Sequence, residues 1–79
     1  MNDILERMDV IIEVFKTNID NQNDASEIID VLNKLLGAIR VTIDLEDCNS
    51  VLRVEAKDFT ADEVINVLNL CGFDCQLMI

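Results

Sequence analysis

Three cysteines are the side chains of this 79-residue chain best suited to hold a soft metal ion. Cys71 and Cys75 are separated by three residues, and Cys48 lies apart in a polar stretch. Thiolates are preferred ligands of Cu(I) and Zn(II), so this CxxxC spacing could serve such a site. Free cysteines are also among the most often buried residues. Both interpretations stay open, and burial in the core is favoured.

A second group of side chains could hold a hard cation through oxygen atoms. Asp20, Asn21 and Asp24 are the candidate ligands, with Asn18 and Asn23 beside them. Carboxylate and amide oxygens are the ligands that hard cations prefer. The same residue types cap helices, and acidic ones also complement the helix dipole. The pattern therefore favours capping over metal binding.

Residues that would support catalysis or a bound cofactor are scarce. The chain has no His, no Gly-rich phosphate loop and no Ser-His-Asp or Cys-His pair. A nucleophile would therefore have no evident base to activate it. We predict that the protein is not an enzyme and has no cofactor.

Charge and composition narrow the class of partner and the compartment. Sixteen acidic residues oppose six basic ones, giving a net charge of −10. Such a surface repels nucleic acid and anionic lipid, and it suits either solubility or a basic protein partner. Three cysteines form no secreted disulfide framework. Neither a membrane-spanning run nor a signal peptide is evident. We expect a cytoplasmic protein of one domain.

Two amphipathic helices would position the candidate ligands. Apolar residues recur at helical spacing over 24–36, where Asp24 and Glu27 resemble a capping box and Gly37 marks the end. A second capping box, Thr60 to Glu63, opens a helix that ends at Gly72 and places Cys71 on its apolar face.

Strands account for most of the remaining chain. Residues 40–46 and 51–56 alternate between apolar and polar, with a short polar loop, 47–50, between them. The pattern of residues 73–78 predicts a final strand, with Cys75 on its apolar side. Residues 10–15 fit a central strand, although residues 4–15 also fit helical spacing; we favour the strand. Residues 1–7 are expected to be an N-terminal extension.

The order β-α-β-β-α-β predicts an α+β fold, a ferredoxin-like sandwich. One four-stranded antiparallel sheet, in the order 4-1-3-2, would carry both helices on one face. The expected buried residues are Ile28, Leu32, Leu35, Val41, Ile43, Leu52, Val54, Val64 and Leu68. This topology also brings the 18–24 segment, Cys48 and the 71–75 segment to one end of the sheet.

The chain resembles the heavy-metal-associated domains over roughly residues 10–78. The resemblance rests on the passage from Leu35-Leu36-Gly37-Ala38 into the strand beginning Val41-x-Ile43, on Thr60 to Val64, and on Cys71-Gly72-Phe73. That family carries a Met-x-Cys-x-x-Cys metal loop at the start of its first helix. Counting back from Gly37 places Ile19 at the Met position and Asn21 and Asp24 at the Cys positions.

The resemblance therefore implies the fold of a metal-binding domain without its usual thiolate ligands. We expect a small, soluble, non-enzymatic domain that works as a protein-interaction or regulatory module. Its open sheet face or first strand would make a contact with a protein partner, with a second copy or with residues 1–8 of the same chain. The alternative is a metal carrier or sensor that uses Cys48, Cys71 and Cys75, or the loop from Asp20 to Asp24.

Overall fold

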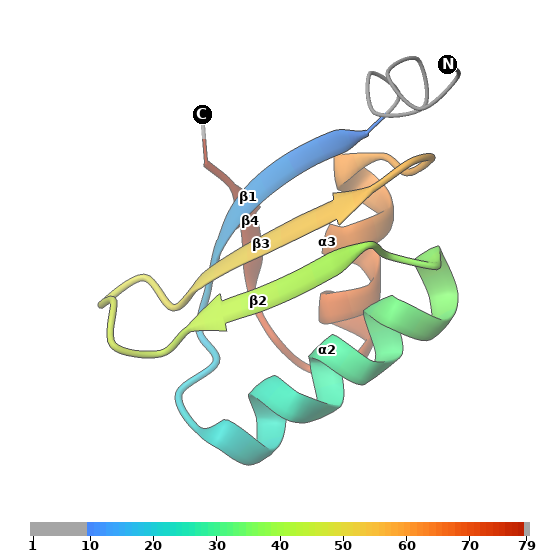
Figure 1. The fold of residues 1–79 in the computed structure, drawn as a ribbon. Helices are drawn as coiled ribbons and strands as arrows, with labels where there is room; N and C mark the ends of the chain where they lie inside the picture. Colours follow the sequence, from blue (N-terminus) through green and yellow to red (C-terminus); the bar gives the residue numbers. More distant parts are fainter. Residues whose placement is uncertain (1–9, 79) are drawn as a thin grey trace.

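The computed structural model describes residues 10–78 as one sheet covered by two helices (Figure 1). The elements in chain order are β1 (Ile11–Thr17), α2 (Gln22–Leu36), β2 (Arg40–Asp44), β3 (Val51–Ala56), α3 (Ala61–Leu70) and β4 (Cys75–Leu77). Neighbouring strands are antiparallel, in the order β2-β3-β1-β4. This is the predicted order read from the other edge. The expected extension over residues 1–7 lies outside the described residues.

The first strand is a central one, as the sequence favoured. β1 pairs with β3 from Ile11 opposite Ala56 to Phe15 opposite Leu52. On its other side, β1 pairs with β4 from Phe15 to Thr17. The helical alternative is therefore wrong for residues 11–15. Strand pairing wins here because a central strand needs apolar side chains toward the core and tolerates them on its other face.

The core lies between one face of the sheet and both helices. Phe15, Leu52 and Val54 point from the central strands into it and are fully buried. The helices contribute further buried side chains, which are Ala25, Ile28, Leu32, Val64 and Leu68. Because these residues form one cluster, α2 and α3 cover the same face of the sheet. No helix within residues 10–78 is long and apolar enough to cross a membrane.

Two of the expected core residues are less buried than predicted. Ile43 is only partly buried, on the edge strand β2. Leu35 is wrong as a core residue, since 64% of it is exposed. Leu35 lies to one side of the buried row Ile28–Leu32, in the last turn of α2, where β2 is the strand that the helix contacts.

The ends of several elements differ from the expected ones for local reasons. β2 stops at Asp44 rather than 46, because the Asp44 carboxylate accepts the Glu46 N–H at 3.0 Å and turns the chain. β4 begins at Cys75 rather than 73, because the Phe73 N–H is still bonded to the Leu68 carbonyl at the end of α3. The capping box of α3 is confirmed: Thr60 N–H donates to the Glu63 carboxylate at 2.8 Å.

Leucines on α2 provide a matched test of this core. Leu32→Ala should lower the free energy of unfolding by about 2–5 kcal/mol, because it leaves a cavity at a fully buried site. Leu35→Ala, on the same helix, should change it by less than about 0.5 kcal/mol. Urea denaturation followed by circular dichroism measures both values. Equal losses from the two variants would contradict the placement of α2.

Candidate functional site

Two loops and the end of β1 meet at one end of the sheet, where the candidate ligands were expected to gather. Thr17, the last residue of β1, donates its N–H to the Asn49 carbonyl at 2.9 Å and its hydroxyl to the Ser50 carbonyl at 2.8 Å. The buried Ser50 hydroxyl in turn donates to the Ile19 carbonyl. These bonds fix the β2–β3 loop against the connection from β1 to α2.

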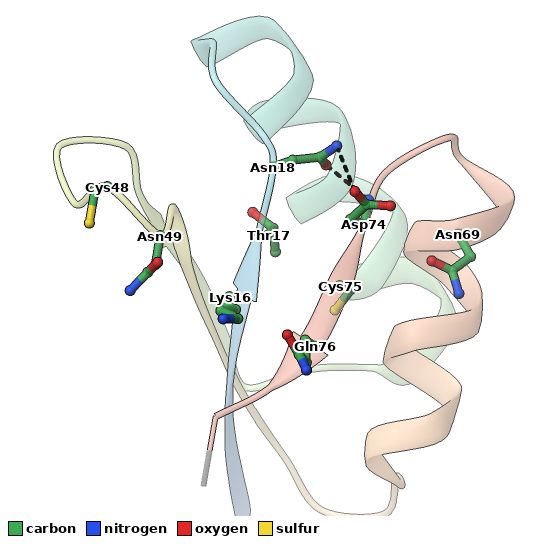
Figure 2. A pocket seen from close by; sticks show the side chains of 9 residues that line it. All are labelled: Lys16, Thr17, Asn18, Cys48, Asn49, Asn69, Asp74, Cys75 and Gln76. Carbon is green, nitrogen blue, oxygen red and sulfur yellow. Dashed lines mark hydrogen bonds between the residues drawn. The ribbon is translucent and has the colours of Figure 1, made fainter.

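A third segment, the turn from α3 into β4, is joined to the same end of the sheet by two hydrogen bonds that involve side chains. The Asp74 N–H donates to the Asn18 side-chain oxygen at 2.9 Å, and the Asn18 amide donates to the Asp74 carboxylate at 3.4 Å. Figure 2 shows this pair joining the connection between β1 and α2 to the turn that leads into β4. The predicted meeting of the 18–24 and 71–75 segments at this end of the sheet is therefore confirmed for Asn18 and Asp74.

An open hollow of about 610 Å³ lies at this end, and its walls are about equally polar and apolar. Its lining residues are Lys16, Thr17, Asn18, Cys48, Asn49, Asn69, Asp74, Cys75 and Gln76 (Figure 2). Small-molecule sites are usually concave and mainly apolar, with a few polar groups that orient the ligand. This hollow has the polar groups, but it is open to solvent and only about half of its wall is apolar. It is therefore a poor match to a substrate pocket.

The loop of Asp20, Asn21 and Asp24 is a helix cap. α2 begins at Gln22, two residues before the predicted start, and Asn21 is its N-cap. The Asn21 side-chain oxygen accepts the Asp24 N–H at 2.9 Å. Its amide group donates to the Asp20 carboxylate at 3.0 Å and to the Asp24 carboxylate at 2.9 Å. Asp24 was expected to be the cap, and that is wrong: it is the residue whose N–H is capped.

The three cysteines do not converge on one point. Cys48 is exposed in the β2–β3 loop, whereas Cys75 is on β4. Since β1 lies between β3 and β4, these two thiols sit on opposite sides of β1 (Figure 2). Cys71 was expected in the core but is exposed at the end of α3, outside the hollow. Residues 10–78 contain no group of three or more Cys, Asp or Glu side chains placed to hold a metal ion.

Burial alters the acidity of the Cys75 thiol. It points from β4 toward the core face, opposite Thr17, and is partly buried there. Removal from water disfavours the thiolate and raises the pKa of Cys75 to about 11. A thiol with a raised pKa is a poor nucleophile and metal ligand at neutral pH. The expected burial of Cys75 is therefore confirmed in part.

The open face of the sheet carries a mixture of apolar and charged groups. Ile12 and Val14 on β1 point away from the helices, because Phe15 between Val14 and Lys16 points into the core. Met78 lies beside Val14, since its N–H donates to the Val14 carbonyl at 2.8 Å. On β3, Arg53 forms an ion pair with Glu55 at 3.2 Å. The sequence indicated this mixed face but did not reveal the position of Met78.

The thiols should differ in their reactivity with iodoacetamide. At pH 8 Cys48 and Cys71 should be alkylated first, and Cys75 should react at least about tenfold more slowly, because its raised pKa leaves little thiolate. Mass spectrometry of timed samples measures the order. In urea the three rates should become similar. Fast alkylation of Cys75 in the folded protein would contradict its placement.

Comparison with known proteins supports a relationship at the level of the fold. No family model matches this sequence, and no curated protein matches it either. Among solved structures, the chain is similar to the yeast copper transporter domain Ccc2A, determined in solution in its apo and Cu(I)-loaded states. The two share 21% identity with a TM-score of 0.72, over 86% of this chain and 94% of that one. The chain thus has a ferredoxin-like fold, which it shares with this copper transporter domain.

Proposed function

We propose that this domain acts by binding another protein and does not carry Cu(I) or Zn(II) in the loop before α2. The observation that carries the proposal is the Asn21 cap. In this loop the side chains of Asn21 and Asp24 are bonded to each other and to the start of the helix. The copper transporter domain of similar fold is described as Cu(I)-loaded. The resemblance to the heavy-metal-associated domains places Asn21 and Asp24 at the positions of that family's cysteines.

The chemistry of the loop supports this reading. An amide and two carboxylates offer hard oxygen atoms, whereas Cu(I) prefers thiolates. Using Asn21 or Asp24 as ligands would also break the bonds that satisfy the first turn of α2. The cysteines elsewhere offer no substitute within residues 10–78, because Cys48 and Cys75 are separated by β1 and Cys71 lies outside the hollow.

The open sheet face supports a protein contact. Ile12 and Met78 are 47% and 41% exposed, and Val14 between them is partly buried. Exposed apolar side chains among polar ones are typical of the centre of a modest protein interface. The net charge of −10 would steer a basic partner and make association weaken as salt is added.

The same features argue for a non-enzymatic, cytoplasmic role. The chain contains no His, and the open hollow at the end of the sheet brings no base beside its cysteines. Cys75, the partly buried thiol beside it, is held protonated by burial. Three unpaired cysteines suit a reducing compartment.

Site-specific photo-crosslinking in cells of the native host tests the proposed contact. A benzophenone side chain at Met78, on the open face, should give a discrete crosslinked protein, and adding Val14→Lys should remove it by placing a charge in the contact. The matched control is Asn33, exposed on the outer side of α2. Absence of a product from Met78, or the same product from Asn33, would contradict a contact through this face.

A further inference from the structure

The edge of β1 is only partly covered by its neighbour β4. β1 runs from Ile11 to Thr17, but β4 pairs only with Phe15, Lys16 and Thr17. On this side, no strand within residues 10–78 lies beside Ile11 to Glu13. On the other side, β3 pairs with β1 along its whole first half, from Ile11 to Phe15. Among the described residues, β1 therefore has no strand partner on this side over Ile11 to Glu13.

The backbone groups of alternate residues in this part of β1 point to the side on which β4 lies. The Val14 carbonyl faces β4, because it accepts the Met78 N–H at 2.8 Å. Along a strand the N–H and C=O of every second residue face the same side. Ile12 and Val10 therefore direct their hydrogen-bonding groups to the side of β4, beyond Met78. Such a row of free donors and acceptors is a template for another strand.

The side chains beside this edge are apolar and unusually exposed. Ile11 and Ile12, one on each face of the sheet, are 36% and 47% exposed. Met78, which follows β4 and lies beside Val14, is 41% exposed. An added strand would cover these three residues while it satisfied the backbone. Affinity would come from the backbone bonds, and selectivity from alternate side chains on the two faces.

The charges around the edge indicate which strand would fit. Glu13 follows Ile12 directly, and the chain as a whole carries a net charge of −10. A second copy would bring a second net charge of −10 to this acidic edge. A segment with Lys or Arg beside its apolar residues complements it instead.

We propose that an extended segment of a partner protein adds to the sheet along Val10–Ile12, antiparallel to β1 and in line with β4. Its alternate residues are β-branched or otherwise apolar, and basic residues flank them. This inference deepens the proposed function and rests on it, because it names the mode of contact and the chemistry of the partner.

Peptide binding to the full chain, followed by NMR, tests the proposal. The probe is acetyl-Lys-Lys-Val-Thr-Val-Thr-Val-Lys-Lys-amide. It should bind saturably, and the amide of Ile12 should become protected from hydrogen exchange. A peptide with Glu in place of every Lys should bind at least about tenfold more weakly. A peptide with Pro in place of the central Val should also lose binding, because Pro lacks the N–H that the ladder needs.

Variants of the protein sharpen the test. Ile12→Pro removes the outward N–H and should abolish binding of the lysine peptide, while the bonds of Ile11 and Glu13 toward β3 remain. Thr42→Ala, on the far edge strand β2, should leave binding unchanged. Should Ile12→Pro fail to fold, the exchange measurement on the unaltered chain still decides the question.

The outcomes separate this inference from the broader function. Binding with protection of the Ile12 amide supports strand addition. The peptide could instead shift the resonances of Val14 and Arg53 on the open face without protecting the Ile12 amide. That result overturns strand addition and leaves the proposed protein contact in place. No saturable binding up to about 1 mM overturns strand addition, and the crosslink at Met78 then decides the proposed function by itself.

Discussion

The antiparallel pairing of β1 with β3 is the constraint on which the rest of the structure depends. Its register places Phe15 opposite Leu52 and Glu13 opposite Val54. A shift by one residue would turn every side chain of β1 to the other face. Phe15 would then leave the core, and Val14 would enter it. The same register leaves Ile12 and Val14 on the open face, so the core and the proposed contact surface are set by one pairing.

Hydrogen bonds join three segments at one end of the sheet. Thr17, Ser50 and Ile19 tie the β2–β3 loop to the connection before α2, and Asn18 ties that connection to Asp74. These bonds hold the two loops and the turn into β4 together. Asn21 then satisfies the first turn of α2 and binds both neighbouring carboxylates. The polar groups of this loop are thereby engaged in structure.

Much of the fold could be predicted from the sequence because its signals are local. Alternation identified β2 and β3, the Thr60–Glu63 box identified the start of α3, and Gly37, with its left-handed φ of 57°, marked the end of α2. The errors arose where tertiary position decides. Leu35 and Cys71 both have helical spacing that suits the core, but each is exposed at the end of its helix.

The candidate site was less predictable, for a similar reason. The sequence brought Cys48 and Cys75 to the same end, but only the strand order shows that β1 separates them. Either Asn21 or Asp24 could have capped α2, and the choice depends on where Ile19 enters the core. Ser50 gave no signal at all: its left-handed φ of 43° and its bond to Ile19 depend on a contact distant in the sequence.

Anaerobic titration with Cu(I) against a coloured chelator tests the central claim most directly. The unaltered protein should leave the metal with the chelator, because the loop before α2 offers Asn21 and Asp24 and no thiolate. The Asn21→Cys/Asp24→Cys double variant should withdraw about one equivalent. A tight one-to-one complex of the unaltered protein, lost on Cys48→Ser, Cys71→Ser or Cys75→Ser, would contradict the account and favour a metal carrier with unusual ligands. So would a double variant that binds no better than the original chain.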